Sequence, residues 1–490
     1  MRSILLFLTL LWGYHILFWH ELMGLNLFVF GLAVIAIGFF KNRPFKLLPV
    51  HWFLLVLSLA NGVAVLWVNT SFSMVLFVLL SITTYGSFQL STNAALEAFA
   101  NSLFNIFNPR QGLIPGLAGS IATPKIKGVL YLRLSIIPLL IFFIYILLFS
   151  AGNSIFHSWS GRFMERFMGF FEGLSLEYFF FILLGIIIVR WVMRTGWAKF
   201  ISLVPNNNLQ RKVRVRYFKN MALKHEYLSA FILLVLLNLL FLAVNVIDIR
   251  WVWFQFYVPA DFSLKEFVHD GVFWLICTLL ISMGLILHYF RGNLNFYKDN
   301  NRLKTLAYFW IFQNAILTFS VVLRTLYYVD FHGLASGRIG LLLFLGMVLF
   351  GLFTLAWKIK RRYNTSFVLR VNTLFVIGLL GISALFPWNH IMVRYNLSHG
   401  NVNEIDVDYY LQLDPQVFPV VYENLDLIGN QIEGHQKNEV TWISYASIEA
   451  FEKQLELKSR DYLHHRSEKG WASWSRADQK AVTALEDLID

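Results

Sequence analysis

Long apolar runs, separated by short polar or charged segments, occupy most of the chain before residue 390. An α-helix needs about 20 apolar residues to cross the hydrocarbon core of a bilayer. We therefore predict an all-α, polytopic membrane bundle with about eleven transmembrane helices. The predicted spans are 4–18, 22–40, 50–68, 72–90, 129–150, 175–194, 226–247, 268–290, 303–327, 337–359 and 367–387.

The first two predicted spans resemble the two arms of a hairpin. Apolar residues follow Arg2, as they do in a signal peptide, but no small-residue cleavage site comes after them. His20 and Glu21 follow instead, and the second apolar run ends at Lys41. We expect an uncleaved helical hairpin here.

Composition supports a membrane protein. Hydrophobic residues make up 57% of the chain and charged residues 14%, and a bilayer can solvate apolar surface that a soluble fold would have to bury. The net charge is +12, which in a soluble protein would suggest nucleic acid as a partner. Here the basic residues gather in alternate loops, as the positive-inside rule describes. We therefore expect the lipid bilayer as a partner and no nucleic acid.

The loop charges also predict an orientation. Lys and Arg are frequent in the loops around 41–46, 110–127, 190–219, 291–304 and 358–362. The other loops carry few basic residues, mixed with acidic ones. The N-terminus is then cytoplasmic, and eleven spans put the C-terminal segment outside. The basic run within 190–219 is interpreted as an orientation signal, with binding of an acidic partner as the alternative. The amphipathic stretch from 94 to 104 predicts an interfacial helix.

Charged residues become frequent after Trp388, and no further long apolar run follows. We divide the chain into a transmembrane bundle, 1–390, and a C-terminal helical soluble domain, 391–490. Helices are expected at 406–413, 415–425, 444–465 and 475–488. Ser475 and Asp478 resemble a capping box with Asp in place of Glu. Trp471 and Trp474 are expected to be packing anchors.

Metal and cofactor motifs are scarce. The pairs His20-Glu21 and His225-Glu226 lack the second histidine that a zinc-binding helix of the zincin type requires. Cys277 is the single cysteine, so the chain cannot form an internal disulfide. No glycine-rich phosphate loop and no Gly-x-Ser-x-Gly elbow occurs. We expect no metal and no cofactor, and the sequence identifies no catalytic residue.

Ionisable residues at the predicted outer ends of the spans form the candidate site. Asp270 begins the eighth span and Arg324 lies near the end of the ninth, so both are predicted at similar depth. They are interpreted either as an ion pair that fixes helix packing or as part of a site for a polar substrate or proton. If the helices converge, an outward-facing polar basin results. Its predicted members are His269, Asp270, Arg324, Tyr328, His332, Arg338, Asn389, Arg394 and Glu21.

Several segments together resemble a known family. They are FVHDG at 267–271, LRTLYY at 323–328, HGLASGRI at 332–339, WNHIMVRYN at 388–396 and WASW at 471–474. This pattern resembles bacterial membrane proteins of the domain of unknown function 4173 (DUF4173) family, close to its sister family 4153. Ala335 stands where that family usually has Thr. The resemblance covers about residues 130–490 and implies a polytopic protein of the bacterial cytoplasmic membrane without an established activity.

Three functions remain open. The first is a transporter-like or envelope-sensing protein that binds a polar ligand in the outer basin. The second is an accessory or structural subunit with a membrane-protein partner. The third is an intramembrane enzyme acting on a lipid-linked substrate, with Asp270 or His269 as acid or base. The first two are non-enzymatic and are preferred.

Overall fold

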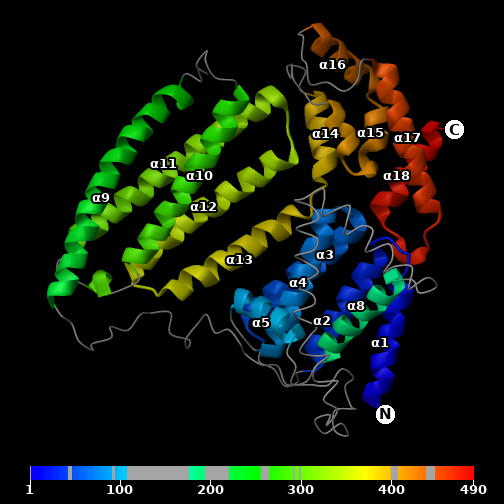
Figure 1. The fold of residues 1–490 in the computed structure, drawn as a ribbon, viewed down its shortest axis with the longest axis horizontal. Helices are drawn as coiled ribbons and strands as arrows, with labels where there is room; N and C mark the ends of the chain where they lie inside the picture. Colours follow the sequence, from blue (N-terminus) through cyan, green and yellow to red (C-terminus); the bar gives the residue numbers. More distant parts are fainter. Residues whose placement is uncertain are drawn as a thin grey trace, which may run out of the picture. The chain divides into compact units, whose positions relative to one another are not determined.

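The computed structural model describes residues 2–41, 47–90, 94–107, 176–193, 220–254, 264–290, 293–296, 300–398, 407–437 and 447–489. These residues form helices joined by turns, and no strand occurs among them (Figure 1). The predicted all-α fold class is confirmed.

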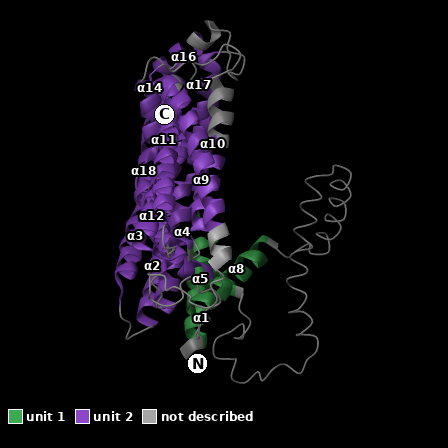
Figure 2. Cartoon of the chain, turned by 90° about the vertical axis from the view of Figure 1, so that its left-hand side faces the viewer, with its two compact units in different colours: residues 1–21, 101–200 green, residues 22–100, 201–490 purple. Residues whose placement is uncertain are grey.

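The chain divides into two compact units (Figure 2). The first comprises Met1–Glu21 and Asn101–Phe200, and the second comprises Leu22–Ala100 and Ile201–Asp490. Helix α5 (Ala95–Phe107) carries the expected amphipathic stretch and crosses the boundary between the units.

In the first unit, α1 (Arg2–Phe18) packs against α8 (Leu176–Met193). The rings of Tyr14 and Phe181 stack with their centroids 4.7 Å apart. A Cβ atom at Gly185 would lie 2.5 Å from the ring of Tyr14, so the missing side chain is what allows this close approach. Phe7, Val189 and Met193 form the apolar core of the pair.

In the second unit, α2 (Leu25–Lys41), α3 (Pro49–Trp67) and α4 (Ser71–Leu90) pack together. Gly31 and Gly38 lie seven residues apart, on one face of α2. A Cβ at Gly38 would lie 2.6 Å from the ring of Tyr85, and one at Gly31 would collide with the ring of Phe77. Small residues therefore let α2 approach α4 closely, as is common between membrane helices.

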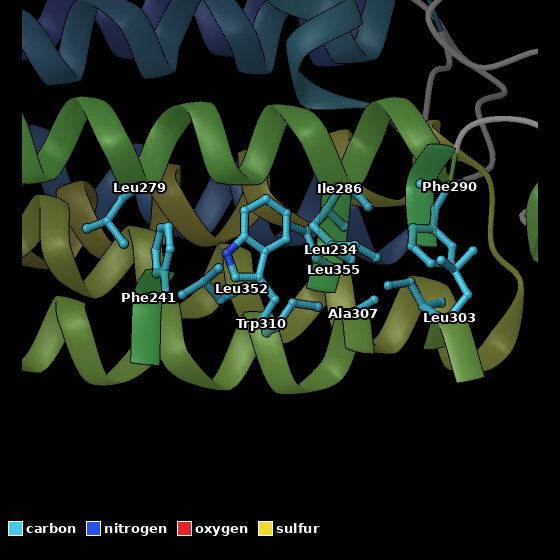
Figure 3. Close-up of a cluster of buried hydrophobic side chains, with 14 of the residues drawn as sticks. Leu234, Phe241, Leu279, Ile286, Phe290, Leu303, Ala307, Trp310, Leu352 and Leu355 are labelled. Atoms are coloured by element: carbon cyan, nitrogen blue, oxygen red, sulfur yellow. The ribbon is translucent and has the colours of Figure 1, made fainter. Parts of the chain in front are cut away.

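The other long helices of this unit follow one another in space, with α9 against α11, α11 against α12, and α12 against α13 (Figure 1). Helix α10 packs on α11 and α12, and α13 also contacts α3. Trp310 of α11 lies in the apolar core of this group, edge-on to Phe241 (Figure 3). The bounds are α9 Asn220–Asp248, α10 Leu264–Tyr289, α11 Asn301–His332, α12 Ser336–Arg361 and α13 Thr365–Ser383.

Every predicted span except 129–150, which lies outside the described residues, coincides with a helix. Among the described residues, six helices are long and apolar enough to cross a membrane: α3, α4, α9, α11, α12 and α13. The protein is therefore a multi-pass membrane protein. The count of eleven spans stays a prediction, as do the cytoplasmic N-terminus and the outer C-terminal segment.

The C-terminal segment is helical, as expected, and supplies most of the residues of one apolar core. Tyr410, Phe418 and Phe451 are buried at the centre of that core, which also includes Ile339 of α12. The predicted domain boundary at residue 390 stays a prediction. The elements are α14 Trp388–Ser398, the 3-10 turns Val407–Gln412, Pro415–Val417 and η5 Trp471–Ser473, α15 Phe418–Tyr422, α16 Leu425–Lys437, α17 Ile448–Ser467 and α18 Arg476–Ile489.

Candidate functional site

A line of polar side chains, most of them buried, runs between α11 and α9 with the turn that follows α9, and we call it the α9–α11 seam. Its contacts are Asn238 Nδ2 to Leu306 O at 3.1 Å, Asn245 Nδ2 to Gln313 O at 3.2 Å, Gln313 Nε2 to Asn238 Oδ1 at 2.7 Å and Trp253 Nε1 to Ser320 Oγ at 3.0 Å. The bonds from Asn238, Asn245 and Trp253 join residues 68, 68 and 67 positions apart. This nearly constant offset shows that the two helices run parallel.

The seam ends in a buried ion pair. Arg324 Nη2 donates to Asp248 Oδ1 at 2.6 Å, and the two side chains are 10% and 8% exposed. An arginine on a helix extends toward the N-terminus of that helix, so the guanidinium of Arg324 reaches back along α11 to Asp248. Asp248 ends α9, and the π-helical turn η1 (Ile249–Trp253) follows directly. Such turns often occur at functional sites.

Several buried oxygen atoms of the seam have no hydrogen-bond donor among the described residues. They are Asp248 Oδ2, Asn245 Oδ1 and Gln313 Oε1. A buried polar atom without a partner is costly and usually signals a bound water or a functional role. All three atoms are acceptors, and the charge of Asp248 is balanced by Arg324. A group that satisfied these three oxygens would have to donate hydrogen bonds.

The structure gives Arg324 a partner that the sequence did not indicate. This partner is Asp248, and the predicted pairing of Arg324 with Asp270 stays a prediction. Asp270 and His269 lie in α10, but their side chains are outside the described part of the structure. Asp248 also lies on the predicted outer side, but nothing in the sequence indicates the register that brings it to Arg324.

Four predicted site residues lie beside the seam, at the end of α11 and the start of α12. Arg324, Tyr328 and His332 are spaced four residues apart, along one face of α11. The rings of Tyr328 and His332 are 4.4 Å apart, and the guanidinium of Arg338 lies 4.5 Å from the centre of the Tyr328 ring. Arg338 also donates to the carbonyl oxygens of His332 and Gly333. Arg338 therefore fixes the turn between α11 and α12.

The remaining predicted members have other roles or places. Asn389 donates to Asp414 Oδ2 at 2.7 Å, within the C-terminal segment. Burial raises the pKa of Asp414, and this hydrogen bond opposes the rise. Arg394 is exposed on α14. Glu21 belongs to the first compact unit, whereas the others belong to the second.

Sequence reasoning missed the role of Asn396. Its Oδ1 accepts from Leu334 N at 2.6 Å, and its Nδ2 donates to Leu334 O at 3.0 Å. One amide thus satisfies both backbone groups of one residue in the α11–α12 turn. Asn396 occurs in the segment 388–396 that carries the family resemblance, which was the available signal.

Sequence reasoning also missed most of the contacts of Asp478, a buried carboxylate on α18. Its oxygens accept hydrogen bonds from Asn69 Nδ2 at 2.6 Å, Gln416 Nε2 at 2.9 Å, Tyr462 Oη at 2.8 Å and Ser475 Oγ at 2.7 Å, and Arg466 forms an ion pair with it. The predicted capping interaction is present, because Asp478 N donates to Ser475 Oγ at 3.2 Å. The same carboxylate also attaches the C-terminal segment to the turn between α3 and α4, and we call this group the Asp478 hub.

The described residues contain no group of three or more His, Cys, Asp or Glu side chains arranged to hold a metal ion. Cys277 is a free thiol in α10.

Comparison with known proteins gives one match. Neither the curated proteins nor the solved structures contain a match to this chain. A family model described as "Domain of unknown function (DUF4153)" matches residues 4–424. The resemblance to DUF4173 pointed to a related but different family. Since the match covers most of the sequence, the chain belongs to the DUF4153 family.

Proposed function

We propose that the protein is a transporter-like or envelope-sensing membrane protein whose α9–α11 seam binds a small polar ligand rich in hydrogen-bond donors. The observation that carries this proposal is the buried second carboxylate oxygen of Asp248, which has no donor among the described residues, whereas the first oxygen is paired with Arg324. Two amide oxygens, those of Asn245 and Gln313, are similarly unsatisfied in the same seam. A ligand with several donors would satisfy them.

The ion pair suggests how binding would be coupled to helix movement. A ligand ammonium group would compete with Arg324 for Asp248, because both cations donate to the same carboxylate. Displacing Arg324 would weaken a contact that holds α9 against α11. The ligand would then favour a different arrangement of the two helices, as a transporter or sensor requires. Amines and amino-sugars are therefore the favoured ligand class.

A thermal-shift screen of the purified full-length protein tests this proposal. The panel would contain primary amines, amino-sugars, polyols and carboxylic acids, and Asp248→Asn would be compared with the wild type. We expect at least one amine to raise the melting temperature of the wild type but not of Asp248→Asn. Asp461→Asn is the matched control, because Asp461 is exposed on α17, and it should respond like the wild type. An equal response in Asp248→Asn, or no response to any amine, would overturn the proposal.

An accessory subunit is the second candidate, and a different observation favours it. Arg338, Asn389 and Asn396 are engaged within the chain, where they fix the α11–α12 turn and the C-terminal segment. Part of the predicted outer basin thus serves to hold the protein's own elements together. Native mass spectrometry after gentle extraction distinguishes the candidates. A stoichiometric second protein supports the subunit, whereas a lone chain with a bound small molecule, lost in Asp248→Asn, supports the ligand-binding function.

A further inference from the structure

Exposed apolar side chains gather where the C-terminal segment meets α2 and α3. They come from three separate segments: Leu22 and Met23 before α2, Trp67 at the end of α3, and Trp471 and Trp474 at η5. Their exposed fractions are 41%, 44%, 57%, 65% and 43%. We call this group the aromatic rim.

Backbone contacts hold η5 against the start of α2. Leu22 N donates to Ser473 Oγ at 2.7 Å, and Leu25 N donates to Trp474 O at 2.9 Å. A Cβ at Gly24 would lie 2.6 Å from Trp474 O, so only glycine permits this approach. Ala472 and Ser473 are each 1% exposed. The small residues of the WASW motif are therefore the docking element, and the predicted role of its two tryptophans as packing anchors is wrong.

The aromatic rim continues the exposed face of α3. Trp52, Val56, Leu59, Val63 and Trp67 recur at helical spacing and are 40–63% exposed. The opposite face of α3 is buried and includes Leu54, Asn61 and Val65. Since α3 is one of the six membrane-spanning candidates, we expect its exposed apolar face to contact lipid. Trp67 is the last residue of that face, where the bilayer boundary is expected.

We propose that η5 lies in the headgroup layer of the bilayer, with the aromatic rim as its membrane anchor. Tryptophan favours this layer because its ring is largely apolar and its N–H is polar. The guanidinium of Arg476 lies 4.0 Å from the centre of the Trp67 ring, which places a cation at the level of the lipid phosphates. The partner of this surface is therefore lipid, and the C-terminal segment is a membrane-surface element rather than a domain surrounded by water.

Spin-label accessibility in lipid nanodiscs tests the proposal on the full chain. Labels would be attached at Trp471→Cys and Trp474→Cys in a Cys277→Ala background. Val63→Cys supplies the lipid-facing reference and Leu457→Cys, 52% exposed on α17, the water-facing reference. We expect the labels at 471 and 474 to collide more often with oxygen than with a water-soluble nickel chelate, as the label at 63 should. The label at 457 should collide more often with the nickel chelate than with oxygen.

Two results would overturn the proposal. Labels at 471 and 474 that behave like the label at 457 would place η5 in water. Labels shielded from both oxygen and the nickel chelate would show that protein, such as a second copy of the chain, covers the rim. Because Trp471 is 65% exposed, its replacement removes little packing, and an unchanged melting temperature of that variant confirms that the fold is intact.

Discussion

The Asp248–Arg324 pair shows how one contact can be costly to break and yet replaceable. Two charges lose their hydration when they are buried, and their attraction compensates only while both are present. We expect Arg324→Leu to destabilise the protein by about 3–5 kcal/mol, because it leaves the Asp248 carboxylate buried and alone. The double variant Asp248→Leu/Arg324→Leu should recover most of that loss. Thermal unfolding midpoints in one detergent measure both effects. A double variant less stable than the single one would contradict the prediction.

Gly333 is a second residue whose local geometry affects stability, because its backbone conformation and its close neighbour both require glycine. Its φ is +79°, a conformation that residues with a side chain rarely adopt. A Cβ there would also lie 2.7 Å from Asn396 Oδ1. We expect Gly333→Ala to cost about 1–3 kcal/mol, measured as a lower unfolding midpoint. Gly337→Ala is the control, because a Cβ at Gly337 meets no atom within 4 Å, and an equal loss there would count against this explanation.

Residue types at the seam were predictable, but their partners were not. Arg324 could be identified because a charge within a membrane span needs a partner. That Asp248 is a partner depends on the register of α9 against α11, which is set by side-chain packing along the whole interface. Asn245 and Gln313 lie within apolar spans, where single amides typically form interhelical hydrogen bonds. The partner of each amide, and the place of Asn238 beside them, depend on the same register.

At the scale of elements, the approach of α2 to α4 depends on glycine. We expect Gly38→Ala to lower the unfolding midpoint, because its Cβ would lie 2.6 Å from the ring of Tyr85. Gly284→Ala in α10 is the control, since a Cβ there meets no atom within 4 Å. Alanine is also the better helix former, so this control should be neutral or slightly stabilising. The same loss in both variants would exclude packing as the cause.

Element positions follow from the apolar runs, because helix length in a membrane is set by the bilayer. The ends are less predictable. The second span was expected from residue 22, but α2 begins at Leu25, since the backbone of the preceding residues bonds to η5. That contact joins segments about 450 residues apart, and no local pattern could reveal it.

At the scale of the whole molecule, the joint between α14 and the C-terminal core should respond to pH. Burial, and secondarily Arg394, lower the pKa of His390, although a backbone hydrogen bond with Gln416 opposes them. The folded state therefore binds fewer protons than the unfolded state, and stability falls as the pH drops below about 6.5. We expect His390→Gln to reduce the fall of the unfolding midpoint between pH 7.5 and about 5. A midpoint with unchanged pH dependence would contradict this.

Asp414, in the same joint, should give stability the opposite pH dependence. Its pKa is raised by burial from 3.8, so the folded state retains the proton more readily and stability falls as the pH rises through that raised pKa. Asp414→Asn should remove this loss, because asparagine does not ionise. Its midpoint should therefore rise relative to the wild type at pH 7, whereas the His390 variant gains at acidic pH. If Asp414→Asn leaves the midpoint at pH 7 unchanged or lowers it, the burial argument is wrong.

The Asp478 hub determines whether the C-terminal segment and the helices α2–α4 behave as one body. Asp478→Ala leaves Arg466 buried without its carboxylate, which we expect to cost about 3–5 kcal/mol. Because Asn69 loses its Asp478 contact as well, hydrogen exchange should increase at the α3–α4 turn and at the start of α2, in addition to α18. Asp487→Ala, an exposed change on α18, should leave exchange unaltered. If exchange increases only within residues 447–489, the hub stabilises that segment alone, and the attachment to α2 and α3 depends on the backbone contacts of η5.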